Sequence, residues 1–190
     1  MMREIFVTKL YEAEIDDEKL LSALAHSIRT LAQNDEAGRR WSKEHRYAGY
    51  TSYASLNDLP KRDPAFSELS KLLTHDATAF AKKVFDITRK PRLDSLWVNL
   101  LKAGGQHSGH IHPHSIISGT LYVEVPKGSG AVRFEDPRLP LMMAAPARPN
   151  IFVTIDPRPG LLLMWESWLR HEVLPGTGKG ERLSISFNFA

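Results

Sequence analysis

The 190-residue sequence contains no cysteine. Disulfides, thiolate metal ligands and a cysteine nucleophile are therefore excluded, and any bound metal must be held by nitrogen and oxygen atoms. No run approaches about 18 uninterrupted apolar residues, and the start, MMREIFVTKLYEAEI, reaches acidic residues before an apolar core of signal-peptide length. These absences predict a soluble, cytoplasmic protein without a membrane partner.

A strong charge imbalance is also missing. The chain has 25 Lys and Arg against 22 Asp and Glu, a formal net charge of +3. This small excess does not indicate a polycation, so a nucleic-acid partner is not expected, and the predicted substrate is a small molecule or peptide of unknown identity. With 42% hydrophobic residues, the length predicts a single domain, 1–190. The apolar stretch LPLMMAAPARP, residues 139–149, indicates a contact or lid and leaves a homodimer open.

Residues 1–93 are predicted to be a helical and loop elaboration. In DDEKLLSALAHSIRTLAQND, residues 16–35, apolar residues recur at helical spacing. A second helix begins at Asp63, an N-cap followed by proline, and carries one apolar stripe. The stripes are expected to pack on the outside of a large sheet; their residues are Leu20, Leu24, Ile28, Phe66, Leu69, Leu73 and Phe80.

The stretch between the helices, RRWSKEHRYAGYTSYASLNDLP at residues 39–60, is aromatic, polar and rich in turn residues. It predicts a loop that reaches over a site. Its aromatic side chains either line a substrate or fasten the loop to a barrel; they are Trp41, Tyr47, Tyr50 and Tyr53.

Residues 94–190 change to short β-rich runs separated by Pro and Gly, which predicts an antiparallel sandwich or barrel. The fold class is therefore mainly β with flanking helices. The runs are DSLWVNLLKA, SIISGTLYVEV, GAVRFED, NIFVTID, GLLLMWE, WLRHEVL and RLSISFNFA.

Four of the eight histidines fall within residues 107–114, in QHSGHIHPHSIISG. His110 and His112 stand two apart, and this spacing puts both side chains on one face of a β-strand, as a metal site requires. His107 has the opposite parity, and His114 follows Pro113, which ends or bends the strand. We therefore take only His110 and His112 as candidate ligands from this segment.

The last predicted strand alternates Leu183, Ile185, Phe187 and Phe189 with polar residues that begin at Arg182 and Ser184. One face is thus apolar, and the other suits a pocket or solvent. His171 precedes Arg182 by eleven residues, and the connection PGTGKGE could bring the two strands side by side. His171 and Arg182 would then share a cavity, and His171 would supply a third imidazole to the metal.

Together, H-x-H at 110–112, His171, and R-x-S at 182–184 resemble the 2-oxoglutarate- and Fe(II)-dependent oxygenases. The segments SGHIHPHSIISGTLYVEVPKGSGAVRFEDPR and PGLLLMWESWLRHEVLPGTGKGERLSISFN resemble more closely a bacterial branch labelled "putative 2OG-Fe(II) oxygenase". The resemblance covers Trp97 to Asn188, and its separate pieces keep the same order and spacing.

This resemblance implies a double-stranded β-helix, or jelly roll, with helices packed on its major sheet. It implies that His110, His112 and His171 hold Fe(II) and that 2-oxoglutarate chelates the metal. Arg182, assisted by Ser184, would pair with the distal carboxylate of 2-oxoglutarate, a role that suits the planar guanidinium. Tyr122 and Asn99 would add hydrogen bonds to the same cosubstrate or simply line the barrel. The implied activity is a dioxygenase, and a hydroxylase in particular.

One position departs from the family pattern, which has Asp or Glu where this chain has His112. A three-histidine iron site, an unbound His112 beside the metal, or a different metal such as Zn(II) are all open. His112 lies on the same face of the predicted strand as His110, which favours His112 as a ligand.

Two further functional classes remain open. A cupin-like enzyme would use the three histidines without 2-oxoglutarate, although the glutamate of the first cupin motif would fall at Ile116 or Ile117. Arg182 and Ser184 would then bind substrate. Alternatively, the barrel could bind a small acidic ligand or a partner protein without catalysis.

Overall fold

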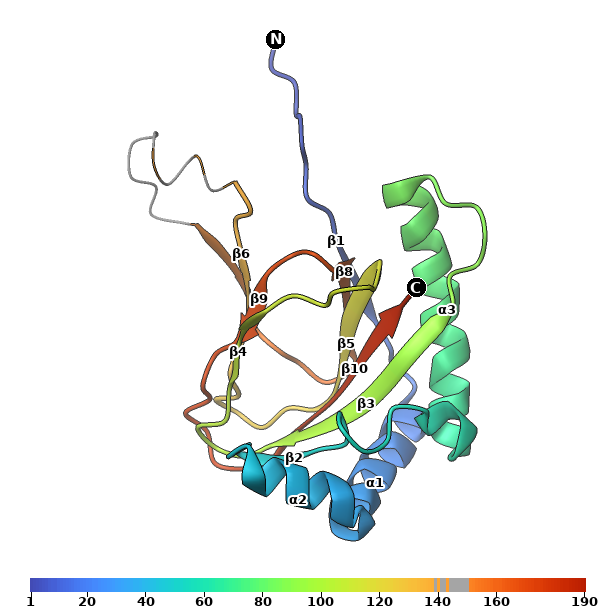
Figure 1. The fold of residues 1–190 in the computed structure, drawn as a ribbon, viewed down its shortest axis with the longest axis vertical. Coiled ribbons are helices and arrows are strands. Elements are labelled where there is room, and N and C mark those ends of the chain that lie inside the picture. The colour runs from blue at the N-terminus through green and yellow to red at the C-terminus, as the bar shows by residue number, and fades with distance from the viewer. Residues whose placement is uncertain (139, 141–142, 144–150) are drawn as a thin grey trace.

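Two antiparallel β-sheets face each other at the centre of the protein (Figure 1). The computed structural model describes residues 1–138, 140, 143 and 151–190. Within these residues, the strand order of the larger sheet is β1-β8-β5-β10-β3-β2, and that of the smaller sheet is β4-β9-β6-β7. The strands are β1 Leu10–Glu14, β2 Gly49–Thr51, β3 Leu93–Leu101, β4 His107–His110, β5 Ile117–Glu124, β6 Val132–Glu135, β7 Phe152–Ile155, β8 Leu161–Glu166, β9 His171–Val173 and β10 Arg182–Phe189.

From β3 to β10 the chain passes repeatedly from one sheet to the other. β3, β5, β8 and β10 lie in the larger sheet, whereas β4, β6, β7 and β9 lie in the smaller one. This is the double-stranded β-helix that the family resemblance implies. The apolar face of β10 points to the helices, and its polar face points between the sheets.

Helices α1, Glu18–Asn34, and α3, Pro64–Phe85, begin where the sequence predicts. The Asp17 carboxylate accepts a hydrogen bond from the Leu20 backbone N–H at 3.0 Å, and Asp63 accepts one from Ala65 at 2.8 Å. Both bonds satisfy N–H groups that the first helical turn leaves free. The two helices cover the outer face of the larger sheet (Figure 1).

The predicted apolar stripes of these helices are buried, as expected. Each of these large side chains contributes about 1.5–3 kcal/mol by leaving water. They pack in one cluster with the outward apolar residues of β3 and β10, and the helix residues concerned are Leu20, Leu24, Ile28, Phe66, Leu69, Leu73 and Phe80.

The predicted loop at residues 39–60 is wrong at its start, because Glu36–Glu44 forms helix α2. The Asp35 carboxylate caps this helix by accepting from the Gly38 N–H at 3.0 Å. The buried positions of α2 are Gly38 and Ser42, so the helix has no apolar stripe of large side chains. The 3-10 turn Leu59–Lys61 ends the segment.

Strands β1 and β2 come from the first 93 residues and join the larger sheet, although the sequence pattern does not predict them. β1 pairs with β8, and β2 pairs with β3. Strands of five and three residues contain too few alternations to be separated from loop by pattern, and here the neighbouring strand supplies the hydrogen bonds.

Two further predictions concern a membrane-spanning helix and the apolar stretch at residues 139–149. In the described part of the chain, no helix is long and apolar enough to cross a membrane. The apolar stretch 139–149, predicted to be a contact or lid, lies outside the described residues except for Pro140 and Met143.

Candidate metal and cosubstrate site

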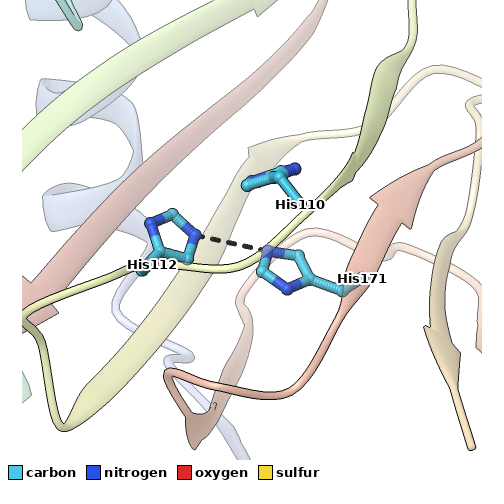
Figure 2. A group of neighbouring side chains, drawn as sticks. All are labelled: His110, His112 and His171. Atoms are coloured by element: carbon cyan, nitrogen blue, oxygen red, sulfur yellow. Dashed lines mark hydrogen bonds between the residues drawn. The ribbon is translucent and has the colours of Figure 1, made fainter. Parts of the chain in front are cut away.

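Three histidines meet between the sheets (Figure 2). One potential ligand atom from each of His110, His112 and His171 lies within 4.8 Å of the others. His110 and His171 are direct partners across β4 and β9. His112 lies just beyond the end of β4, where its backbone N–H donates to the Ser167 carbonyl at 3.0 Å. The structure therefore brings together the three imidazoles that the sequence singles out.

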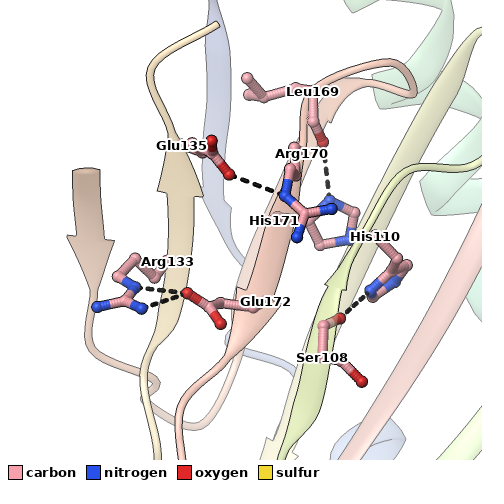
Figure 3. A network of polar contacts seen from close by, with 8 residues as sticks. All are labelled: Ser108, His110, Arg133, Glu135, Leu169, Arg170, His171 and Glu172. Atoms are coloured by element: carbon pink, nitrogen blue, oxygen red, sulfur yellow. Dashed lines mark hydrogen bonds and ion pairs between the residues drawn. The ribbon is translucent and has the colours of Figure 1, made fainter. Parts of the chain in front are cut away.

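Backbone carbonyls orient two of these rings (Figure 3). His110 Nδ1 lies 2.7 Å from the Ser108 carbonyl, and His171 Nδ1 lies 2.9 Å from the Leu169 carbonyl. A carbonyl oxygen only accepts, so each Nδ1 carries the proton and donates. The Nε2 lone pair of each ring is then available for a metal, since such a hydrogen bond usually fixes the tautomer of a metal-binding histidine.

The cluster fits a divalent metal. His112 Nε2 and His171 Nε2 are 3.3 Å apart, the separation expected for two bonds of about 2.1 Å that meet at about 100°. Burial lowers the pKa of His171 to about 3 and that of His112 to about 4, so both rings are neutral at physiological pH and able to bind. Within the described residues, no carboxylate joins the cluster. Three imidazole nitrogens suit Fe(II) and Zn(II) alike.

The polar face of β10 lines a cavity of about 440 Å³ that also contains the three histidines. Arg182, Ser184, Ser186 and Asn188 all point into this cavity. Ser184 lies opposite Asn99 on β3 and opposite Tyr122 on β5. The four predicted cosubstrate residues thus lie on adjacent strands of the larger sheet, on the cavity side; they are Arg182, Ser184, Tyr122 and Asn99.

Arg182 is a buried cation with unused hydrogen-bonding capacity. Its side chain is 4% exposed, and its Nη1 donates to the Gly130 carbonyl at 3.0 Å. Its Nε has no partner among the described residues, and burial lowers the pKa of the guanidinium. Leaving such a group unpaired is costly, so this site favours an anionic ligand.

Alternation puts His107 on the other strand face and so leaves it out of the ligand set; it is indeed absent from the histidine cluster, but its side chain still lines the cavity. The register of β4 shifts between His107, opposite Val173, and His110, opposite His171. Between these two pairs, two residues of β4 oppose one residue of β9, which is a β-bulge. The bulge turns His107 into the cavity, where burial lowers its pKa to about 3. His114 remains exposed and outside the cavity, as predicted.

The expected pairing of the strands that carry His171 and Arg182 is also wrong. β9 lies between β4 and β6 in the smaller sheet, whereas β10 lies between β5 and β3 in the larger one. The connection after β9 crosses from one sheet to the other. The two residues still share the cavity because they face each other across the sandwich.

The aromatic residues between the helices divide into two roles. Trp41, Tyr47 and Tyr53 line the cavity. The Tyr47 hydroxyl lies 2.8 Å from His107 Nε2 and 3.3 Å from Asn99 Oδ1, and burial raises the pKa of Tyr47. Tyr50 instead packs in the core and donates to Asp35 at 2.8 Å, which fastens the segment to α2.

Comparison with known proteins gives one family. Residues 95–188 match the family model described as "Putative 2OG-Fe(II) oxygenase". No curated protein sequence matches the chain.

Several solved structures share the fold. A Pseudomonas putida prolyl-4-hydroxylase aligns with a TM-score of 0.64 at 18% identity, over 96% of this chain and 92% of the other. The α-ketoglutarate-dependent epimerase SnoN aligns with a TM-score of 0.66 at 18% identity, over 96% of this chain and 78% of the other. HygX from Streptomyces hygroscopicus, with nickel and 2-oxoglutarate bound, aligns with a TM-score of 0.63 at 13% identity, over 96% of this chain and 82% of the other. At these identities the likeness shows the jelly-roll fold alone, and it is the family match over the jelly-roll strands that makes this chain a member of the 2-oxoglutarate- and Fe(II)-dependent oxygenase family.

Proposed function

We propose that this protein is an Fe(II)- and 2-oxoglutarate-dependent hydroxylase in which His110, His112 and His171 hold the iron. When bound, iron and 2-oxoglutarate together supply the activation of O2 for oxidation of a C–H bond. The protein's own residues hold the cosubstrate, orient the substrate and shield the site from water.

The observation that carries this proposal is the buried Arg182 in the same cavity as the three histidines. A dicarboxylate cosubstrate can reach the imidazole cluster with one end and a guanidinium with the other. The fork of the guanidinium is well suited to a carboxylate, and no side-chain carboxylate of the described residues forms an ion pair with Arg182.

The surrounding residues support different roles. Ser184 is buried two residues from Arg182, on the same face of β10, and would donate its hydroxyl to the same carboxylate. Burial raises the pKa of Tyr122 to about 12, so its hydroxyl keeps its proton and can donate as well. Asn99 accepts from Thr51 at 2.9 Å, and its Nδ2 donates to Ser186 at 3.1 Å. Because most of its amide is already engaged, we assign Asn99 to positioning Tyr47 and β10.

The donor set contains no carboxylate, so the metal would carry one more positive charge than in the two-histidine, one-carboxylate arrangement. We propose His112 as the residue in the carboxylate's place, because its Nε2 and that of His171 are at a separation suited to one ion. The extra charge would add to the attraction of the metal for the anionic cosubstrate, beside that of Arg182.

The test is an anaerobic titration of 2-oxoglutarate into the Fe(II)-loaded protein, followed by the metal-to-ligand charge-transfer absorbance. We expect Arg182→Ala to weaken 2-oxoglutarate binding by about two to three powers of ten, because removing one partner of a buried charge pair costs about 3–5 kcal/mol. Arg182→Lys should recover part of the affinity, since an ammonium keeps the charge but not the two-pronged geometry. Iron affinity should stay nearly unchanged in both variants.

Arg158→Ala is the matched control, because Arg158 is an exposed arginine that pairs with Glu12 outside the cavity. It should bind 2-oxoglutarate as the parent does. Equal affinities for the parent and both Arg182 variants would remove Arg182 from the cosubstrate site. The cupin-like enzyme without 2-oxoglutarate would then be the better description.

A cytoplasmic location, a homodimer, and a small molecule or peptide as substrate stay predictions. Fractionation of expressing cells tests the first, and light scattering on the purified protein tests the second.

A further inference from the structure

We propose that the substrate's reactive part enters the cavity as an uncharged ring or other flat apolar group, packed against Trp41, Tyr53 and Trp97. This inference rests on the proposed function, because it assigns Arg182 to the cosubstrate. The remaining residues of the cavity wall then determine which substrate groups can bind.

A row of aromatic rings leads from the surface to the metal ligands. The ring centroids of Trp41 and Tyr53 are 6.1 Å apart, and those of Tyr53 and Trp97 are 5.4 Å apart with the planes inclined by 69°. The next step, from Trp97 to His112, is 6.0 Å. All four residues line the cavity. A group that moves along this row would keep contact with an aromatic face or edge up to a candidate metal ligand.

Among the described residues, the outer part of this cavity wall is open to water. Tyr53 is 57% exposed and Ile111, also on the cavity wall, is 46% exposed, whereas Trp97 further in is 7% exposed. Apolar side chains that converge on a concave site and remain open to water are typical of ligand pockets.

Fastening of the segment does not account for these exposed rings. Tyr50 fastens it, with 3% exposure and a hydrogen bond to Asp35. Trp41 stacks on His45 with centroids 4.1 Å apart and planes inclined by 15°, and His45 lies four residues along the same segment. That contact is local and leaves the cavity side of Trp41 available.

The charges of the wall exclude a charged reactive group. Apart from the histidines, the only ionisable side chains among the described lining residues are those of Arg182, Tyr47, Tyr53 and Tyr122. No aspartate, glutamate or lysine lines the cavity within that part of the chain, and the other polar wall residues are neutral Ser, Thr and Asn. Once a cosubstrate carboxylate neutralises Arg182, a charged substrate group would leave water without a partner, which is strongly unfavourable. An uncharged group meets no such penalty.

The experiment uses indole as the uncharged test compound, with indole-3-acetate and tryptamine as its anionic and cationic counterparts. The ¹⁵N-labelled full chain is loaded with Zn(II), a diamagnetic substitute for Fe(II), and with 2-oxoglutarate. The four tryptophans give four side-chain N–H resonances, which Trp→Phe variants assign. We expect indole to move the Trp41 and Trp97 resonances and to bind at least tenfold more tightly than either charged compound.

Variants locate the binding. Trp41→Ala and Tyr53→Ala should each weaken indole binding about three- to tenfold, the effect of losing one aromatic contact. Trp168→Ala is the matched control, because Trp168 is a 47% exposed tryptophan that does not line the cavity and bonds to Glu166. It should leave indole binding unchanged.

The same sample reports the two proposals separately, because 2-oxoglutarate alone should move the Arg182 Nε resonance before indole is added. Unmoved Trp41 and Trp97 resonances, or equal binding of a charged compound, would overturn the substrate inference while the proposed function stood. An unmoved Arg182 resonance together with normal indole binding would instead overturn the proposed function and keep the preference of the cavity.

Discussion

The two sheets contribute to the site in different ways. The larger sheet has strands of up to nine residues, and its outer face packs in one apolar cluster with α1 and α3. Its inner face carries Arg182, Ser184, Tyr122 and Asn99. The smaller sheet has strands of three and four residues, yet it carries His110 and His171.

In the described part of the chain, the outer side of the smaller sheet carries two ion pairs (Figure 3). Arg133 Nε on β6 donates to Glu172 Oε1 on β9 at 2.6 Å, and Arg133 Nη2 forms an ion pair with the same oxygen at 2.5 Å. Arg170 donates to Glu135 at 2.8 Å. Both pairs tie β9, or the residue before it, to β6. The difference shows that most of the apolar packing supports the cosubstrate wall, whereas the metal ligands depend on strand pairing and local hydrogen bonds.

The largest effect on stability should come from the core of the larger sheet. Phe187→Ala should lower the free energy of unfolding by about 3–5 kcal/mol, because Phe187 is fully buried in the cluster with the helices. Phe134→Ala on the smaller sheet should cost less, since Phe134 also lines an open surface groove that water can fill. Denaturant unfolding of both metal-free variants gives the comparison. Equal losses would show that both sheets support the fold to the same degree.

Removing a proposed metal ligand should instead have a large effect on metal affinity and a small effect on stability. His171→Ala should weaken metal binding by more than about a hundredfold, because loss of a mere hydrogen-bond partner of a ligand already costs about 10–100-fold. The metal-free protein should lose less stability than with Phe187→Ala, since the His171 ring borders the cavity instead of lying in the apolar cluster with the helices. Calorimetric titration with Zn(II) measures the affinity. His114→Ala, at an exposed histidine outside the cavity, should bind the metal normally.

The pH dependence of stability tests the bulge in β4. In the unfolded chain His107 takes up a proton near its ordinary pKa of 6.5, whereas in the folded protein burial holds that pKa at about 3. The unfolded state therefore binds more protons between these values, and stability, fully present above pH 6.5, falls as the pH is lowered towards 3. His107→Gln should reduce this slope by about 1.4 kcal/mol per pH unit.

The slope is measured by urea unfolding of metal-free protein from pH 7 down to pH 4. His26→Gln, at an exposed position on α1, is the control and should keep the parent slope. An unchanged slope in His107→Gln would mean that His107 faces water, as its parity in an unbulged strand requires.

The smallest effect should come from the ion pairs of the smaller sheet. Arg133→Met should cost about 1 kcal/mol or less in the free energy of unfolding, because both partners remain partly exposed, with side-chain exposures of 32% and 27%. A double-mutant cycle with Glu172→Gln isolates the pair. A coupling energy of several kcal/mol would show that these ion pairs, rather than strand pairing, hold the metal ligands in place.

Much of the fold could be predicted because its determinants are local in the sequence. Asp17 and Asp63 cap helices through their own neighbours, and the apolar stripes follow from helical periodicity. The alternation in β10 separates an apolar from a polar face without reference to any other strand. These features, with the spacing of His110, His112, His171 and Arg182, were sufficient to predict the family, and the structure gathers these four residues in one cavity.

Other features were decided only by the tertiary structure, because they depend on partners far away in the sequence. β1 and β2 are strands because β8 and β3 offer free edges. The connection after β9 crosses between sheets, so His171 and Arg182 face each other instead of lying on paired strands. The bulge that turns His107 inward arises from the register of β4 against β9. Alternation along one strand sets relative orientation, but only the register with a neighbour decides which side chains reach the cavity.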